Sequence, residues 1–461
     1  MTHLRQPCRR FPARLFPVLL LGALAAGPAW AQRAPVVQPS PEAGGSAVPE
    51  AWNAYVQTTY IWQKKWAFPA AYSGTNSLRP DAEKSYSFTA TAFLGLRLWQ
   101  GAEFYYNPEA AQGVPLSGLL GLGGMTNGEM ARTTGPTLVG YNARAFLRQT
   151  IDLGGETAAV ASEANQLAGN VAARRVVVTA GKVAMGDIFD ENRYAHDPRN
   201  DFMNWAIITH GAYDYAADAR GYSLGFAAEY FDPAGWAIRA GRFAMPKESN
   251  GLALDHSLTR QHGDQVELEI NHGLFGRPGT VRFLAFRNKA GMGSFRASLD
   301  LAAATGTTPD LAQTRQTRYK TGYGINIEQP ISDELGAFFR ASRADGKSET
   351  FSYTEIDNSI AGGLVLQGNR WGRANDRIGA ALVRNGLSRD RRDYLAAGGL
   401  GFFLGDGSLN YRPEQILETF YAAQLCKGFT VSLNYQYIRN PAYNADRGPV
   451  NVAAIRLHAE Y

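Results

Sequence analysis

Long segments in which apolar and polar residues alternate constrain this chain more than any other feature of its sequence. In residues 85–99 every even position from Tyr86 to Leu98 is apolar, whereas the odd positions include Ser85, Thr89 and Arg97. Successive side chains of a β-strand point to opposite faces, so this pattern predicts a strand with one apolar face. The same pattern recurs in residues 221–231, 264–271, 319–328, 429–437 and 450–461.

Weaker alternation marks further strands, and short turn sequences such as Gln100-Gly101 separate many of them. These weaker segments are 54–64, 101–107, 140–152, 174–184, 235–243, 279–288, 334–344, 350–357, 359–368, 376–385 and 413–425. The short turns predict that neighbouring strands pair as antiparallel hairpins, and helical periodicity is almost absent. Bacterial outer-membrane barrels have an even number of strands. We therefore assign residues 54–64 to an N-terminal element and predict sixteen strands from the rest.

Strand length and aromatic placement favour a membrane barrel over a soluble sandwich. Several segments reach the roughly 9 to 11 residues that an oblique membrane crossing needs, whereas soluble strands average about 5 to 6. The apolar faces tend to end in an aromatic residue, as expected for girdles at the two lipid interfaces. Examples are Tyr86, Tyr222, Tyr230, Trp236, Tyr319 and Tyr437. The predicted fold is all-β: a transmembrane antiparallel β-barrel whose lumen admits water and small solutes.

The N-terminus has the features of a cleavable signal peptide. Four of the 46 basic residues and no acidic residue lie in residues 1–31, where the apolar run 15–26 precedes the cleavage pattern Ala29-Trp30-Ala31. This predicts export, with residues 1–31 as signal peptide, 32–51 as flexible linker and 52–461 as the barrel domain. The remaining 42 basic residues are balanced by 41 acidic ones. The mature chain therefore lacks the basic bias of a nucleic-acid-binding protein.

Several short stretches occur in a characteristic order along the chain. They are 60–63 with 67–70, 106–109, 187–190 leading into 201–205, 399–401 to 406–407, and 440–444 with 447–449. By the order of these stretches, rather than by any one of them, the chain resembles the carbohydrate-selective porin family typified by OprB, over about residues 52–461. The resemblance implies a sixteen-stranded barrel in the bacterial outer membrane through which small neutral sugars diffuse passively. The terminal aromatic Tyr461 resembles the signal read by the barrel assembly machinery.

A pore that favours neutral sugars needs hydrogen-bonding partners and aromatic faces with little net charge. Arg144 and Arg148 share a predicted inward face with Asn142 and Phe146. Lying four residues apart on a strand, the two arginines are separated by about 13 Å, and at least one is expected at the narrowest part of the pore. The other predicted pore-lining residues are Glu267, Glu269, Arg340, Glu414 and Glu418. For each of the seven, the alternative is a salt bridge that only braces the barrel wall.

Two segments are candidates for the constriction. Residues 108–139 are glycine-rich and poorly patterned, as expected of a loop folded into a lumen. Residues 186–205 contain eight charged or histidine residues in one loop. They do not fit the calcium-loop pattern D-x-[DN]-x-[DN]-G, so we expect salt bridges within the loop rather than a calcium site. We predict no metal and no cofactor.

Other function classes fit less well. A hydrolase needs a nucleophile and a base on one face, and none is evident, so we predict no enzyme activity. An energy-coupled receptor needs an N-terminal plug domain, for which the chain before Ser85 is too short. An adhesin or a purely structural barrel would carry no open pore. A general or anion-selective porin is the main rival, since the same barrel serves both functions. Association of barrels into a homo-oligomer stays open at this point.

Overall fold

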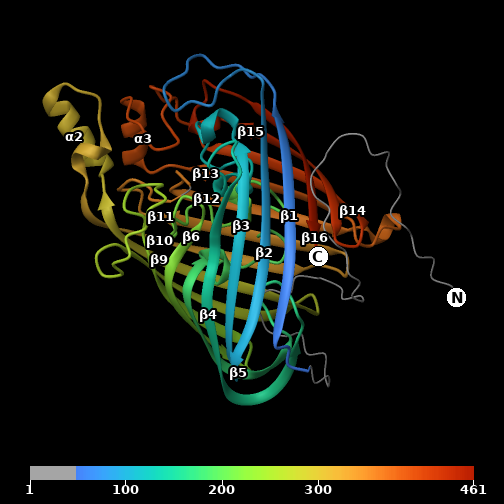
Figure 1. The fold of residues 1–461 in the computed structure, drawn as a ribbon. Coiled ribbons are helices and arrows are strands. Elements are labelled where there is room, and N and C mark those ends of the chain that lie inside the picture. The colour runs from blue at the N-terminus through green and yellow to red at the C-terminus, as the bar shows by residue number, and fades with distance from the viewer. Residues whose placement is uncertain (1–47, 353) are drawn as a thin grey trace.

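The computed structural model describes residues 48–352 and 354–461. They form one closed antiparallel barrel of sixteen strands, each paired with its neighbours in sequence, with β1 joined to β16 (Figure 1). The predicted signal peptide and most of the linker 32–51 lie outside the described residues. The strands are β1 (Trp52–Lys65), β2 (Glu83–Trp99), β3 (Ala102–Val114), β4 (Val139–Val160), β5 (Gly169–Ala184), β6 (Tyr222–Asp232), β7 (Trp236–Ala244), β8 (His262–Leu274), β9 (Arg277–Met292), β10 (Gln316–Pro330), β11 (Leu335–Ala344), β12 (Asn358–Gln367), β13 (Arg377–Gly386), β14 (Glu414–Cys426), β15 (Phe429–Arg439) and β16 (Val450–Glu460).

The strand count is confirmed, but two of the seventeen candidate segments were assigned wrongly. Residues 54–64 belong to β1, which pairs with β2 on one side and with β16 on the other, so that Tyr60 faces Leu457 across the seam. Residues 350–357 form no strand and lie in the loop between β11 and β12. This loop is buried in the barrel mouth, where the apolar Phe351 and Ile356 are as inaccessible as the polar Ser352 and Thr354 between them. Period two alone does not distinguish a strand from such an extended buried loop.

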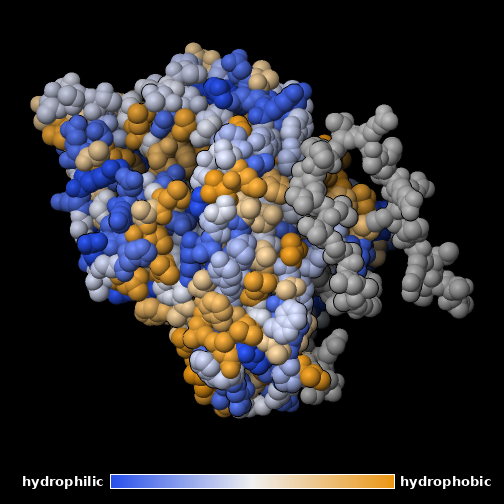
Figure 2. Space-filling model, viewed as in Figure 1, coloured by the Kyte–Doolittle hydropathy of each residue, from blue (hydrophilic) through white to orange (hydrophobic). Residues whose placement is uncertain are grey.

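The alternating faces point as predicted. On β2 the outward residues Leu94 and Leu96 are about half exposed, whereas the inward Thr89 is buried. The last strand behaves alike: Ile455 and Leu457 face outward, while Arg456 and His458 are buried inside. In Figure 2 apolar side chains gather on the outer wall toward the lower end of the barrel, and polar ones predominate toward its upper end. The barrel thus has an apolar exterior and a polar lumen, as a lipid-embedded channel requires.

A bulge makes one predicted face wrong. The register between β3 and β4 shifts at Asn107 and Pro108, where Asn107 pairs with Arg144 but Pro108 pairs with Asn142. Proline lacks the backbone N–H that a regular ladder needs, and opposite it β4 bulges by one residue, Ala143. As a result Asn142 is exposed on the outside, where its side chain accepts a hydrogen bond from the Tyr106 hydroxyl at 2.5 Å. Tyr141 takes the inward position instead.

The two ends of the barrel differ in their connections. Short turns follow every even-numbered strand from β2 to β14, and longer loops follow every odd-numbered strand. The loops carry the helices: α1 (Trp205–Ile208), α2 (Phe295–Thr305), α3 (Arg389–Ala396), η1 (Leu116–Leu119), η2 (Gly128–Arg132), η3 (Met185–Asp187), η4 (Leu311–Thr314), η5 (Gly368–Trp371, in a turn) and η6 (Pro441–Tyr443). α2 and α3 extend beyond the strands at the upper left of Figure 1. Among the described helices, none is long and apolar enough to cross a membrane.

Candidate channel and its inner loops

The loop between β5 and β6, residues 185–221, fills much of the lumen, and we call it the inner loop. Its apolar residues are buried against the wall: Phe202 lies 4.9 Å from Phe420 and 5.6 Å from Phe338 between ring centroids. Inward-facing glycines of the barrel wall have no side chain and so leave space for residues of the inner loop. A Cβ on Gly324 would lie 2.6 Å from the His210 ring, and one on Gly379 would lie 2.9 Å from Phe202. The inner loop is therefore fitted to strands β10 to β14.

Arg340, predicted as pore-lining, is fully buried and fastens the inner loop to β11. Its guanidinium donates to the Asp190 carboxylate at 2.9 Å and to the backbone carbonyls of Ala195 and Ile207 at 2.6 and 2.8 Å. One side chain thus joins three separate points of the loop. Charge-assisted bonds in a dry environment hold such a loop more firmly than neutral ones.

Asp190 and His210 form a titratable pair beneath Arg340. His210 Nε2 lies 3.4 Å from the Asp190 carboxylate, and both side chains are almost fully buried. Burial lowers the pKa of His210 to about 4, although Asp190 acts in the opposite direction. Burial alone would raise the pKa of Asp190, but Arg340 and His210 outweigh it and hold that pKa below its usual value. At neutral pH the loop is therefore held by an ionised Asp190 beside a neutral His210.

Glu418, also predicted as pore-lining, caps the middle of the inner loop. Its carboxylate accepts the backbone N–H groups of Met203 and Asn204 at 2.6 and 2.9 Å. On the next strand but one, Arg456 donates to the carbonyls of Pro198 and Asp201 at 2.7 and 2.8 Å. Carbonyl and N–H groups that have no secondary-structure partner are thereby satisfied by the wall.

The ion pairs of residues 186–205 run mainly to the wall, so the prediction of an internally salt-bridged loop was wrong in this respect. Asp187 pairs with Arg144 of β4, Asp190 with Arg340 of β11, and Asp201 with Arg377 of β13. His196 and Glu191, 3.3 Å apart, are an internal pair. The sequence shows the charges but not their partners, which lie far along the chain. In the part of the chain that the structure describes, no cluster of His, Cys, Asp or Glu is suited to hold a metal ion.

The other candidate constriction, 108–139, is partly strand, because β3 continues to Val114. The remainder, residues 115–138, is a second loop that enters the barrel mouth. Glu414 accepts the N–H groups of Gly123 and Gly124 from this loop at 3.1 and 3.3 Å, and that of Ala442 at 3.1 Å. The two loops are joined through Arg199, which pairs with Glu109 and Glu129, both at 2.8 Å.

Glu267 and Glu269 lie together inside the barrel, as predicted, in a buried charge network. Arg239 of β7 contacts three carboxylates: Glu229 at 2.8 Å, Glu267 at 3.1 Å and Glu269 at 3.0 Å. Arg282 of β9 adds a contact to Glu269 at 2.8 Å. Glu267 also accepts the backbone N–H of Asp190 at 2.8 Å, which ties the network to the inner loop. Both glutamates are thus engaged in ion pairs between neighbouring strands, the arrangement expected of residues that brace the barrel wall.

Arg144 and Arg148 lie apart from this network, on the side of the lumen formed by β3 to β6. Arg144 holds Asp187 through two bonds of 2.6 Å, and its guanidinium lies 5.3 Å from the Tyr222 ring. Arg148 lies 5.1 Å from the Tyr105 ring and 5.3 Å from the Phe146 ring, and it donates to the Asn165 carbonyl at 2.9 Å. Within the described residues Arg148 makes no ion pair.

Further cationic and aromatic residues continue this arrangement, and the sequence did not single them out. Arg132 lies over Tyr222 at 5.3 Å, and Arg220 lies over Tyr141 at 4.0 Å. The Tyr141 and Tyr222 hydroxyls both donate to Glu109, at 2.5 and 3.0 Å. We call this set the arginine–tyrosine face; its members are Arg132, Arg144, Arg148, Arg220, Tyr141 and Tyr222. Arg132 and Arg220 lie in loops, where alternation does not predict the direction of a side chain. Tyr141 was missed because the bulge opposite Pro108 reverses the predicted faces of residues 141 and 142.

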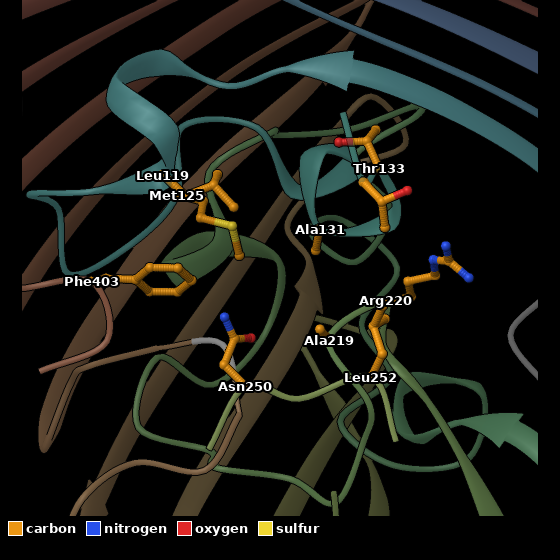
Figure 3. Close-up of a pocket in the computed structure, with 10 residues that line it drawn as sticks. Leu119, Met125, Ala131, Thr133, Ala219, Arg220, Asn250, Leu252 and Phe403 are labelled. Atoms are coloured by element: carbon orange, nitrogen blue, oxygen red, sulfur yellow. The ribbon is translucent and has the colours of Figure 1, made fainter. Parts of the chain in front are cut away.

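A cavity of about 190 Å³ is lined in part by Arg220, a member of this face. Loops from four parts of the chain surround it, with Leu119, Thr133, Arg220, Asn250, Leu252 and Phe403 around its rim (Figure 3). The lining is mainly apolar and includes the polar side chains of Thr133, Thr134, Arg220 and Asn250. Such a mixed lining suits a solute that has both hydroxyl groups and apolar C–H faces.

Comparison with known proteins agrees with this architecture. The model of the carbohydrate-selective porin family OprB matches residues 77–461. The structure of Pseudomonas putida OprB at high pH superposes with a TM-score of 0.67 at 16% identity, covering 89% of this chain and 94% of that one. The Acinetobacter baumannii outer-membrane channel DcaP gives a TM-score of 0.48 at 11% identity, covering 90% and 98%. No curated protein matches significantly. The family match spans most of the barrel, and this chain therefore belongs to the OprB family of carbohydrate-selective porins of the bacterial outer membrane.

Proposed function

We propose that small neutral sugars diffuse passively through this barrel along the arginine–tyrosine face, and that Arg144 and Arg148 contact them. The observation that carries the proposal is the state of Arg148. Its guanidinium stacks beside two aromatic rings and, among the described residues, has no acidic partner to occupy it. A guanidinium is a rigid set of hydrogen-bond donors for hydroxyl oxygens. The rings of Tyr105 and Phe146 are buried, so they hold the guanidinium in place rather than contact a sugar themselves.

The other predicted pore-lining residues take a supporting part in this proposal. Glu267, Glu269, Arg340, Glu414 and Glu418 are fully buried and bound to the wall or to the loops. We assign them to positioning: they hold the two loops so that the open path stays beside β3 to β6. A weak binding site with fast exit suits such a path, because a tight site would block flux.

A general or anion-selective porin is the second candidate. The observation in its favour is that Arg148 and Arg220 both lack an ion pair in the described part of the chain, which leaves positive charge in the lumen. Both functions predict an open channel, but only a sugar-selective one predicts that sugar competes with ions for the path.

Single-channel recording in planar bilayers separates the two. With a neutral monosaccharide added at rising concentration, the sugar-selective pore should show a saturable decrease of ion current. A general porin should show only the small, linear decrease caused by viscosity. A linear response would overturn the sugar path while leaving the barrel and its pore intact.

We further propose that residues 1–31 direct export and are removed, and that Tyr461 assists assembly through the barrel assembly machinery. Tyr461 is 78% exposed, and its backbone exchanges two hydrogen bonds of 2.9 Å with Val56 of β1, so it completes the seam. Its exposure shows that the ring is not required for packing inside the closed barrel. The apolar exterior of the barrel faces outer-membrane lipids, and a homo-oligomer would use part of the same surface.

A further inference from the structure

Five arginines face outward near the loop-bearing end of the barrel, one on each odd-numbered strand from β7 to β15. They are Arg242, Arg287, Arg343, Arg384 and Arg439, and we call them the arginine belt. The side chains of Arg242 and Arg287 are 35% and 55% exposed, and the other three residues are also exposed. These positions alternate with the buried lumen residues of the same strands, so the belt lies on the outer wall.

The strand registers place the belt residues in a row that steps toward the short turns by two residues between Arg287 and Arg343 and by two more between Arg343 and Arg384. Arg242 and Arg287 both pair with Asp264, and Arg343 pairs with Asn358, which pairs with Gly386. Arg384 pairs with Gln415, and Gln415 pairs with Arg439. On the other side, Tyr323 pairs with Arg343, and Thr321 two residues before it pairs with Arg287. Neighbouring strands lie about 4.8 Å apart, so successive belt residues are separated by roughly 10 Å. A row with this spacing follows the rim of the barrel over nine strands.

The belt lies directly above the apolar band. The outward residues two positions toward the short-turn end are apolar or aromatic, including Leu382 below Arg384 and Tyr437 below Arg439. A lipid-facing Arg is strongly destabilising at mid-bilayer but costs little at the interface. The belt is therefore at headgroup depth, where a guanidinium can meet charged lipid headgroups rather than acyl chains.

The charges at the two ends of the barrel are arranged differently. Near the short turns, exposed arginines each have an acidic partner: Arg277 has Asp333, Arg370 has Glu334 and Arg373 has Asp376. In the belt, Arg242 and Arg287 share the single carboxylate of Asp264. Arg343, Arg384 and Arg439 make no ion pair among the described residues. At the short-turn end Lys427 is exposed without an ion pair among the described residues. The loop-bearing end thus presents a row of unneutralised arginines to the membrane, whereas the arginines near the short turns are neutralised.

We propose that the arginine belt binds phosphate groups of phosphorylated glycolipids in the outer leaflet. Long loops of outer-membrane barrels face the cell exterior, so the belt lies in that leaflet. Arginine binds phosphate through two parallel, charge-assisted hydrogen bonds, and basic clusters at headgroup depth are typical of anionic-lipid recognition. The belt would fix the height of the barrel and surround it with a shell of tightly held lipid.

Native mass spectrometry of the purified full-length barrel in detergent tests this proposal with lipid A as the probe. The belt variant is R343Q/R384Q/R439Q, and the matched control is R277Q/R370Q/R373Q, which removes the same charge at the short-turn end. A basic residue near an anionic surface contributes roughly a fivefold gain in affinity, so the belt variant should bind lipid A roughly 100-fold more weakly. The control variant should bind like the wild type.

A second lipid and a soluble competitor show whether the belt recognises the phosphate groups of the lipid. The wild type should bind enzymatically dephosphorylated lipid A only weakly. Its affinity for this lipid should equal the affinity of the belt variant for intact lipid A. Equal binding of both lipids, or wild-type binding by the belt variant, would overturn the proposal. Complete competition by millimolar inorganic phosphate would also overturn it, because the site would then take free phosphate rather than lipid.

Two controls separate a loss of charge from a loss of folding. R343K/R384K/R439K retains the charge and should keep most of the affinity; a loss equal to that of the glutamine variant would contradict recognition by charge. Heat-modifiable gel mobility reports whether each variant is a folded barrel. Because the belt lies outside the lumen, sugar-induced current block should be unchanged in the belt variant. Failure of lipid binding is thus distinguishable from failure of the sugar path.

Discussion

Arg144 and Arg148 lie on one strand but hold different partners. Arg144 is bonded twice to Asp187, at the start of the inner loop, whereas Arg148 contacts rings and one carbonyl. Replacing Arg144 therefore changes both the pore lining and the position of the loop. Replacing Arg148 changes the lining alone, which makes it the cleaner test of sugar contact.

We predict that Arg148→Ala weakens sugar-induced current block severalfold and shifts ion selectivity toward cations, because a positive charge leaves the path. Arg144→Ala should do the same and also increase current noise, since the carboxylate of Asp187 loses its partner. The double variant should conduct more than either. Current–voltage curves in a salt gradient measure selectivity, and Arg370→Ala, 68% exposed at the short-turn end, is the control. Wild-type block and selectivity in the double variant would mean that both arginines only brace the wall.

His210 makes the inner loop sensitive to acid. Its pKa is lowered to about 4 in the folded protein, against 6.5 for an ordinary histidine. Between these values the unfolded loop binds a proton that the folded loop does not, so the stability of the folded loop falls as pH decreases through this window. We predict that channel closures become more frequent as pH falls from 6.5 to 4.

His210→Phe keeps a ring in the same space and removes the titration. Recordings at steps of pH in planar bilayers should therefore show a flat closure frequency for this variant over the same window. A wild-type channel whose closures do not change between these pH values would exclude His210 as the sensitive group.

At the scale of elements, the inner loop depends on wall residues that contact its backbone. Glu418→Gln replaces a carboxylate that accepts two N–H groups by an amide whose NH₂ cannot accept. Hydrogen bonds to charged groups contribute about 1.5 to 3 kcal/mol each, so the loop should loosen markedly. We predict faster permeation of larger sugars and new protease cleavage within residues 198–208.

Glu414→Gln is the matched variant, because Glu414 is as buried but holds the second loop and η6 instead. It should leave residues 198–208 protected. Identical cleavage maps for the two variants would show that neither carboxylate holds a particular loop.

The sequence predicted the barrel and its faces because lipid and lumen impose period two along each strand. It placed Arg148, Arg340 and Glu418 inside correctly for this reason. It did not predict what they bind there, since Glu418 meets Met203 and Arg340 meets Asp190, both from a loop far away in the sequence. Loops lack periodicity, so Arg220 gave no sign of its position beside Tyr141. The same limit explains the two wrongly assigned segments. Residues 350–357 are a buried loop whose sequence predicts a strand, and counting them as one leaves no place for 54–64 in a barrel with an even number of strands.

At the scale of the whole molecule, the barrel separates three tasks. Its exterior meets lipid, with the arginine belt at the outer rim. Buried charges on β7 to β16 hold most of the inner loop, and Arg144 of β4 holds its start at Asp187. We propose that the arginine–tyrosine face gives neutral sugars a favoured path.

Liposome swelling tests that claim most directly, because it measures solute entry itself. Proteoliposomes with the wild-type barrel are diluted into isotonic solutions of neutral monosaccharides or of anionic and cationic solutes of matched size. We predict that neutral monosaccharides enter fastest and that Arg148→Ala reduces this preference. Equal entry rates for neutral and charged solutes of one size, or faster entry of anions, would contradict it.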